Sequence, residues 1–231
     1  MTKKQIISML AIIFAAFSLF LTSVLLKKHR IIIEWDGNTY KLENVNPLDA
    51  KFARPYSKTL DDTGDLFIWI ANSIISITLF VSFITSKDKW PAFKTAFYDC
   101  VIFGSCWIYT ISVYGILKTL AGRIRPYMYF AAPSLKGIEE GDFFRSWPSG
   151  HSTIVWMTFA FLLVWFINRK PDSKFKKILL IISALVCITT MVLRMLSGNH
   201  FLTDVLSGAV IGFLLTLGVS TLFYKNYGGK K

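Results

Sequence analysis

The sequence predicts an all-α, polytopic integral membrane protein with about six transmembrane helices. Of its 231 residues, 53% are hydrophobic, 16% are aromatic and only 17% are charged, which is more apolar than an average soluble domain. Six uncharged apolar runs are also about long enough to cross a hydrocarbon core of about 30 Å at about 1.5 Å per helical residue. We expect a single membrane-embedded domain over residues 1–231 that includes an outer-face segment, residues 27–65.

The first apolar run, Gln5 to Leu26, predicts a transmembrane helix. A secretory signal peptide has a shorter apolar core, followed by a cleavage site of small residues. This run ends instead in two leucines and two lysines, Leu25 to Lys28. We therefore expect the first helix to be retained as a span.

Five further apolar runs complete the predicted bundle, and some of them are short enough to need extension by flanking residues. They are Leu66 to Thr85, Val101 to Leu117, Ser152 to Asn168, Ile178 to Leu193 and Val205 to Tyr224. Asp99 lies close to the third run, where a carboxylate normally faces other helices or water, so we assign it a structural role. No internal repeat or linker suggests a second domain.

Segment 27–65 contains a pattern typical of a short hairpin. Asp36, Gly37 and Asn38 form a turn-like sequence between two strand-like runs. We expect residues Ile31 to Tyr56 to include either a short hairpin or an amphipathic helix that lies on the membrane.

Basic residues predict the orientation of the chain through their density in short loops. The chain termini, the second connection and the fourth connection should share the cytoplasmic side. Their basic residues are Lys3, Lys4, Lys87, Lys89, Lys94, Arg169, Lys170, Lys174, Lys176, Lys177, Lys225, Lys230 and Lys231. The opposite side then receives residues 27–65, 118–151 and 197–200.

The net charge of +12 does not indicate nucleic-acid binding, because the lysines cluster beside apolar runs, where membrane topology explains them.

Cys100, Cys106 and Cys187 lie in or beside apolar segments without metal or redox spacing. We interpret them as small buried hydrophobic residues. No carboxylate or cysteine cluster suggests a metal site, so we expect no metal and no cofactor.

Three cations are expected at the same membrane face. Lys118 ends the third apolar run, Arg125 follows seven residues later and Arg194 ends the fifth run. Guanidinium groups match two phosphate oxygens, and an ammonium group adds a compact positive charge. Each cation alone is better explained as a basic residue that snorkels from a helix end.

The stretch Pro148-Ser149-Gly150-His151 directly precedes the fourth apolar run. Unpaired backbone N–H groups at a helix start favour an anion, Gly150 permits close approach, and Ser149 adds a hydroxyl donor. Proline, serine and glycine are also ordinary helix-start residues. His151 is a candidate general acid and base.

His200 and Asp204 are four residues apart at the start of the sixth run, which places them on one face if the helix begins that early. Asp204 could then orient the imidazole and leave its other nitrogen as a nucleophile. The alternative is that Asp204 caps the helix beside an interfacial histidine.

Together, K-x6-RP, PSGH and R-x5-H-x3-D resemble the signature of the type 2 phosphatidic acid phosphatase superfamily. The resemblance covers Lys118 to Asp204, with flanking helices as in bacterial lipid phosphatases. The family usually has serine before the third-motif arginine, where this chain has Leu193; the change removes one hydroxyl contact and no catalytic group.

The resemblance implies a metal-independent phosphatase that works through a phosphohistidine intermediate. Lys118, Arg125, Ser149, Gly150 and Arg194 would bind the phosphate. His200 would be the nucleophile, Asp204 would orient it, and His151 would protonate the leaving oxygen and then activate water.

A site at the membrane face favours a lipid phosphate: lipid A, phosphatidylglycerol phosphate, phosphatidic acid or undecaprenyl diphosphate. Phosphotransfer to another acceptor stays open. A transporter or channel with a basic mouth would make the motifs coincidental, and vanadate-dependent peroxidases of the superfamily are larger and soluble.

We expect a multi-pass protein of the bacterial cytoplasmic (inner) membrane, with the site facing the periplasm or outside. Its partners should be the lipid substrate and the bilayer, with no nucleic acid and no obligate protein partner.

Overall fold

The computed structural model describes residues 3–30, 34–170 and 173–227, and over these residues it confirms the predicted all-α class. In this described part, six helices are long and apolar enough to cross a membrane. They are α1 (Lys3–Lys28), α3 (Lys58–Ile84), α4 (Lys89–Ala121), α6 (Gly150–Arg169), α7 (Ser173–Leu196) and α8 (Leu202–Tyr227). Two short helices, α2 (Pro47–Phe52) and α5 (Leu135–Glu139), and two 3-10 turns, Leu42–Asn44 and Pro126–Tyr129, lie in the connections.

The helices extend beyond the apolar runs that predict them. The third run covers only Val101 to Leu117, whereas α4 spans 33 residues and begins at Lys89. Once a helix is nucleated, each added residue gains a backbone hydrogen bond, so helical structure continues into polar flanks. α4 ends at Ala121 and is capped by Gly122, whose positive φ of 57° suits a left-handed helix cap.

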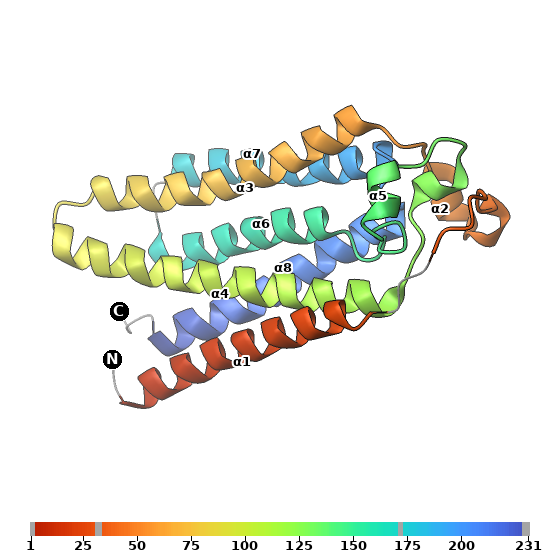
Figure 1. Cartoon of the computed structure of the whole chain (residues 1–231). Helices are drawn as coiled ribbons and strands as arrows, with labels where there is room; N and C mark the ends of the chain where they lie inside the picture. The colour runs from red at the N-terminus through yellow and green to blue at the C-terminus, as the bar shows by residue number, and fades with distance from the viewer. Residues whose placement is uncertain (1–2, 31–33, 171–172, 228–231) are drawn as a thin grey trace.

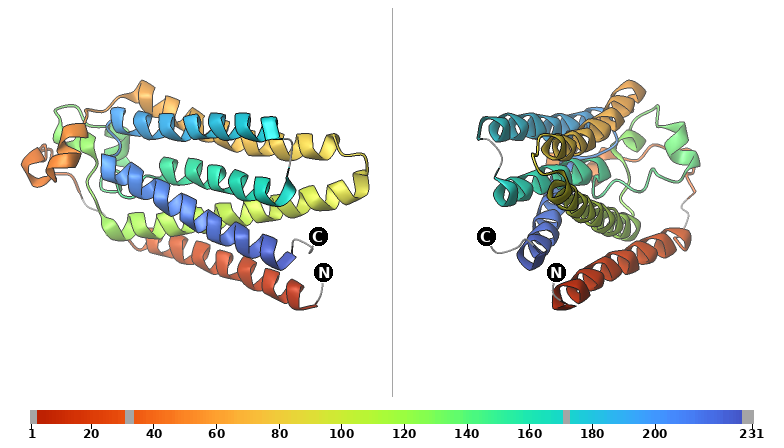
Figure 2. Two further views of the ribbon diagram at one scale, coloured as in Figure 1. Left: turned by 180° about the vertical axis from the view of Figure 1, so that it is seen from behind. Right: turned by 90° about the vertical axis from the view of Figure 1, so that its left-hand side faces the viewer.

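Helix α6 forms the centre of the bundle and is enclosed by α3, α4, α7 and α8 (Figure 1). It is also the most buried of the six spans. Helix α1 lies on the outside, mainly against α4 (Figures 1 and 2). Large apolar side chains such as Phe14, Trp69 and Phe80 point outward, as expected where the surrounding solvent is lipid.

Small residues bring α6 and α8 into close contact. Gly208 and Gly212 are four residues apart on α8 and face the backbone of α6 between Ser149 and Thr153. Closely approaching helices commonly carry this spacing of small residues in membrane proteins. The contact ties the start of α6 to the first turns of α8.

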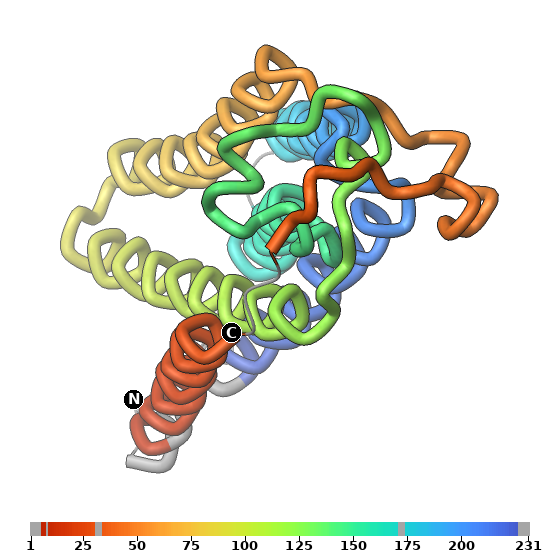
Figure 3. The backbone as a smooth tube through the Cα atoms, turned by 45° about the vertical axis from the view of Figure 1, so that its right-hand side comes forward, coloured from red at the N-terminus to blue at the C-terminus, as the bar shows by residue number. Residues whose placement is uncertain are grey.

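All three motif-bearing stretches lie at one end of the bundle, as predicted. The loops on either side of α2 and α5 gather there, together with the turn between α7 and α8 (Figures 1 and 3). The start of α1, the end of α8 and the connection between α3 and α4 lie at the opposite end, together with the end of α6 and the start of α7 (Figures 1 and 2).

The hairpin prediction covers Ile31 to Tyr56, of which the structure describes residues 34–56. These residues form a turn but no strand, so the prediction is wrong there. Ile31 to Ile33 lie outside the described residues. Asp36 Oδ1 accepts a hydrogen bond from the Asn38 backbone N–H at 3.0 Å, which closes the turn locally. The Tyr40 N–H donates to the Met128 carbonyl at 3.1 Å. The chain then passes through the 3-10 turn into the short helix α2, and whether this helix lies on the membrane, as the alternative interpretation has it, stays a prediction.

At the other end, Asp99 is buried in a polar cluster. It pairs with Arg169 at 2.5 Å and accepts hydrogen bonds from Trp165 Nε1 and the Tyr224 hydroxyl, both at 2.9 Å. These contacts join α4, α6 and α8, consistent with the structural role expected for this carboxylate. Cys106 and Cys187 are buried as predicted, whereas the prediction is wrong for Cys100, which is exposed.

Candidate active site

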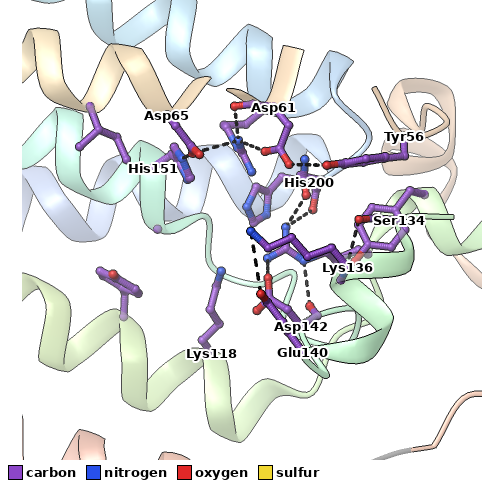
Figure 4. A pocket seen from close by; sticks show the side chains of 18 of the residues that line it. Tyr56, Asp61, Asp65, Lys118, Ser134, Lys136, Glu140, Asp142, His151 and His200 are labelled. Atoms are coloured by element: carbon purple, nitrogen blue, oxygen red, sulfur yellow. Dashed lines mark hydrogen bonds and ion pairs between the residues drawn. The ribbon is translucent and has the colours of Figure 1, made fainter. Parts of the chain in front are cut away.

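A cavity of about 320 Å³ opens at the end of the bundle that carries the three motifs. Figure 4 shows side chains from α3, α4, α5, α6 and the turn before α8 converging on it. Six of the eight predicted site residues line this cavity: Lys118, Arg125, Gly150, His151, Arg194 and His200. The structure therefore brings together residues that are up to 82 positions apart in the sequence.

Lys118 and Arg125 approach the cavity from α4 and the loop that follows it. Lys118 is buried, and its Nζ has no hydrogen-bond partner among the described residues. Arg125 is held from two directions, because its Nη1 donates to Asn199 Oδ1 at 2.8 Å and its Nη2 pairs with Asp142. Arg125 is thus fixed at the cavity wall, whereas Lys118 retains all three of its N–H donors for an anion.

Arg194 lies in the last turn of α7 and turns toward α3. Its Nη1 pairs with Asp61 Oδ1 at 2.5 Å, while its buried Nε has no partner in the described part of the chain. A phosphate that enters the cavity would therefore compete with Asp61 for this guanidinium group.

The helix-start stretch places His151 and Gly150 in the cavity wall but directs Ser149 elsewhere. Ser149 is fully buried, its hydroxyl accepts from the Ser152 N–H, and it is not among the described side chains that line the cavity. This is the helix-capping alternative, so a phosphate contact by Ser149 stays a prediction. His151 Nε2 lies 2.5 Å from Asp65 Oδ1 of α3 (Figure 4).

His200 and Asp204 do not share a helical face, because α8 begins only at Leu202. Asp204 instead lies in the first turn, where its Oδ2 accepts from the Phe201 N–H at 2.8 Å and from Ser146 Oγ at 2.5 Å. The first of these contacts has the geometry of a capping box. His200 Nδ1 is 3.8 Å from Asp204 Oδ2, which is too long for a hydrogen bond.

The buried Nδ1 of His200 has no hydrogen-bond partner within the described residues. A small rotation of the ring would close the gap to Asp204. Burial, together with the charges of Arg125 and Lys118, holds the pKa of His200 well below its usual range. The imidazole is therefore neutral, as a nitrogen nucleophile requires.

Four carboxylates at or near the cavity were not anticipated from the sequence. Asp61 and Asp65 come from the start of α3, Glu140 follows α5, and Asp142 lies in the next loop. Burial opposes ionisation of Asp142, but the charges of Arg125, Lys118 and Arg145 outweigh it and lower the pKa of this carboxyl. Asp61 and Asp65 lie just before the predicted helix at Leu66, whereas Glu140 and Asp142 lie within the predicted outer connection 118–151 without such a signal.

A cation site built from protein ligands is not evident. Over residues 3–30, 34–170 and 173–227, no group of three or more His, Cys, Asp or Glu side chains is arranged to hold a metal ion. The cavity carboxylates are instead paired with basic groups. Metal independence stays a prediction.

Comparison with known proteins gives three consistent similarities. The PAP2 superfamily profile matches residues 99–227, more than half of the chain. Phosphatidylglycerophosphatase B of Bacillus subtilis (strain 168) is 34% identical over 101 residues, which are 43% of this chain and 46% of that relative, so the match spans less than half of the relative's length. The crystal structure of a transmembrane PAP2 type phosphatidylglycerolphosphate phosphatase from Bacillus subtilis covers 91% of this chain and 96% of its own. Its TM-score is 0.50 at 20% identity, a similarity of fold.

Proposed function

Because the chain belongs to the PAP2 superfamily, we propose that it is a membrane phosphatase that hydrolyses a phosphate group from a lipid through a phosphohistidine intermediate. The observation that carries the proposal is the joint placement of three cations and two imidazoles around one cavity at the bundle end. These are Lys118, Arg125, Arg194, His151 and His200. A polyanion is the ligand that this set of groups recognises best.

In the first step, a cavity-facing nitrogen of His200 attacks phosphorus while the bond between phosphorus and the lipid oxygen breaks. His151 donates a proton to the leaving oxygen, so the lipid departs as an alcohol. Asp65 lies 2.5 Å from His151 Nε2 and is in position to hold that ring. Lys118, Arg125 and Arg194 stabilise the negative charge on the transferring phosphoryl group.

In the second step, water attacks phosphorus and the bond between phosphorus and His200 breaks. His151 takes a proton from this water, and inorganic phosphate leaves the cavity. Asp204 stabilises the positive imidazole of the intermediate once the ring has rotated to close the 3.8 Å gap. This cycle restores every group to its starting protonation state.

A lipid substrate is supported by apolar surface next to the cavity. Ile68 of α3 and Ile154 of α6 are part of the cavity wall. Further along α3 and α4, a groove of about 520 Å³ is lined by apolar side chains that include Ile75, Leu79 and Phe103. Ile68 and Ile75 are two turns apart on the same face of α3, so an acyl chain could follow this face while the phosphate stays in the cavity.

Phosphatidylglycerol phosphate is the first candidate among the lipids, because both similar proteins carry that substrate in their names. We also propose that the chain lies in the bacterial inner membrane with its cavity facing outward. Sparse basic charge in the short turn at the cavity end, compared with the basic loops at the other end, supports this orientation.

The function is tested by phosphate release from a lipid panel. Purified protein in detergent is given phosphatidylglycerol phosphate, phosphatidic acid, undecaprenyl diphosphate and lipid A, each with and without a chelator. We expect release to persist in chelator, to be inhibited by vanadate and to be fastest with phosphatidylglycerol phosphate. Complete loss in chelator would contradict the metal-free mechanism, and failure on every lipid would contradict the function.

The nucleophile is tested by His200→Ala, with His29→Ala as the matched control because His29 is exposed beyond the end of α1. We expect His200→Ala to abolish turnover and the trapping of labelled phosphate on the protein, and His29→Ala to preserve both. Trapped phosphate in His200→Ala would assign the nucleophile to another residue.

A further inference from the structure

Arg123, two residues before Arg125, occupies the centre of a polar network beneath the active site. Its Nη1 pairs with Asp204 Oδ1 at 2.5 Å, and its Nη2 pairs with Asp49 Oδ2 at 2.6 Å. Asp49 belongs to α2 in the outer segment, whereas Asp204 belongs to the first turn of α8. One guanidinium group thus connects two fully buried carboxylates from distant parts of the chain.

Thr203 closes this network into a compact unit. Its backbone N–H donates to Asp49 Oδ1 at 2.9 Å, and its hydroxyl donates to Asp49 Oδ2 at 2.6 Å. Arg123 Nη1 also donates to the Thr203 hydroxyl at 2.8 Å. Burial opposes ionisation of Asp49, but its contacts with Thr203 and Arg123 outweigh it and lower the pKa of this carboxyl.

The network reaches His200 from two sides. The Arg123 guanidinium carbon lies 4.4 Å from the centre of the Phe201 ring, directly after His200 in the chain. Asp204, held through Oδ1 by Arg123, keeps its Oδ2 at 3.8 Å from His200 Nδ1. Arg123 itself is not among the described side chains that line the cavity, so it acts on the site only through its neighbours.

We propose that Arg123 is a positioning residue that fixes the Asp204 carboxylate opposite His200, and that Asp49 makes the outer segment a brace for this arrangement. The proposal rests on the proposed function and on the role of Asp204 in it. The proposal assigns a role to α2, a helix of six residues. No described side chain of α2 lines the cavity, yet α2 helps to hold the reaction centre through Asp49.

The physical basis is the competition between Arg123 and His200 for one carboxylate. Arg123 Nη1 holds Asp204 Oδ1 and neutralises part of the carboxylate charge, while Oδ2 is oriented toward the imidazole. Without Arg123, Asp204 keeps the Oδ2 contacts with the Phe201 N–H and Ser146 Oγ but loses its positive partner, so more of its negative charge acts on His200, which strengthens the binding of a proton to the ring. The charged groups that face His200, namely Arg125, Lys118, Arg194 and His151, remain in place.

Two variants test the proposal: Arg123→Gln and Asp49→Asn. We expect Arg123→Gln to lower kcat by about 10- to 100-fold, as loss of an orienting partner does at other sites, with KM within about threefold of the parent. Asp49→Asn should give a smaller loss in the same direction. Because Asp49 acts through Arg123, adding Asp49→Asn to Arg123→Gln should reduce kcat little further.

The decisive readout is the titration of His200, followed by NMR of labelled histidine in the detergent-solubilised protein. It needs no substrate, and we expect His200 to bind its proton at higher pH in Arg123→Gln than in the parent chain. Arg54→Gln is the matched control, since the Arg54 side chain donates only to backbone carbonyls of its own segment among the described residues. Its kcat and titration should equal those of the parent.

Several outcomes would overturn the inference. A folded Arg123→Gln variant with kcat within about twofold of the parent would do so, and so would an unchanged titration of His200. If Arg123→Gln fails to fold, Arg123→Lys replaces it, because a single ammonium group cannot hold both carboxylates and should show the same changes. A parent chain that hydrolyses no lipid phosphate refutes the proposed function, whereas an active parent with an equally active Arg123→Gln refutes this inference alone.

Discussion

Asp61 and Asp62 are adjacent residues on α3 with different surroundings. Asp61 Oδ1 pairs with Arg194 at 2.5 Å and Asp61 Oδ2 accepts from the Tyr56 hydroxyl at 2.9 Å, both at the cavity. Asp62 pairs with Lys58 one turn away, and both of those side chains are mostly exposed. A phosphate in the cavity would meet the charge of Asp61, whereas solvent screens the charge of Asp62.

We therefore predict that Asp61→Asn strengthens the binding of phosphate analogues. Removing a competing carboxylate next to Arg194 should favour an anion by about 1 to 2 kcal/mol, or about 5- to 30-fold. The inhibition constant for vanadate measures the effect, with Asp62→Asn as the control that should leave it unchanged. Weaker inhibition of Asp61→Asn would mean that Asp61 positions Arg194 rather than competing for it.

His200 should make the stability of the protein sensitive to acid. Its folded-state pKa is held below the ordinary value of about 6.5, so above that pH the ring is neutral in both states. As the pH falls below about 6.5, the unfolded chain binds a proton that the folded chain excludes, and the free energy of unfolding decreases by up to about 1.4 kcal/mol per pH unit. The His200→Gln variant lacks this pH-dependent contribution to the free energy of unfolding.

Thermal unfolding in detergent between pH 7 and pH 5 tests this expectation. The unfolding temperature of the parent should fall more steeply with acid than that of His200→Gln. Parallel curves would show that His200 is as easily protonated in the folded protein as in the unfolded chain.

Spacing in the sequence predicted the three cations and two imidazoles that line the cavity, because motif order and helix ends indicate which membrane face each residue reaches. It did not identify Asp65, Asp142 or Arg123, since their partners come from other helices and no local pattern encodes such pairs. The spacing put His200 and Asp204 on one helical face only if the helix began early enough, whereas α8 begins at Leu202, and helix starts are the least certain part of a pattern.

At the scale of elements, the contact between α6 and α8 depends on the glycines of α8. A methyl group at Gly212 would collide with the backbone of Thr153, and one at Gly208 would collide with the Ser149 carbonyl. Gly218, on the same helix, has no described atom within 4 Å of such a methyl group. The three positions therefore differ in packing although they share the helical backbone.

We predict that Gly212→Ala lowers the unfolding temperature and also lowers phosphatase activity, because the start of α6 carries Gly150 and His151. Gly218→Ala is the matched control and should keep or slightly raise stability, since alanine is the better helix former by about 1 kcal/mol. An unchanged unfolding temperature in Gly212→Ala would show that α6 and α8 can move apart without a loss of stability.

The apolar runs predicted six long helices and their order, because a lipid solvent requires every spanning segment to satisfy its own backbone. They did not predict α2 or α5, which are too short for a periodic pattern. The turn at Asp36 was recognisable from its residues, but the strands beside it were not formed within residues 34–56. There, Tyr40 finds its backbone partner at Met128, far away in the sequence.

At the scale of the whole molecule, the orientation is open to a labelling test. In a chain with Cys100, Cys106 and Cys187 replaced by alanine, Lys51→Cys reports on the cavity end and Lys87→Cys on the opposite end; both positions are exposed. We expect an impermeant thiol reagent to label Lys51→Cys in intact cells and Lys87→Cys only after permeabilisation. The reverse pattern would place the cavity in the cytoplasm.

The PAP2 profile begins only at Asp99, yet α3 lies before it and supplies Asp61, Asp65 and Ile68 to the cavity wall. The groups that perform the proposed reaction and the surface that meets the rest of the lipid thus come largely from different halves of the chain. Substitutions on α3 could change lipid preference during evolution while the reacting groups stay constant. Exchange of α3 between relatives, with Asp61 and Asp65 kept as partners of Arg194 and His151, offers a direct route to new substrate selectivity.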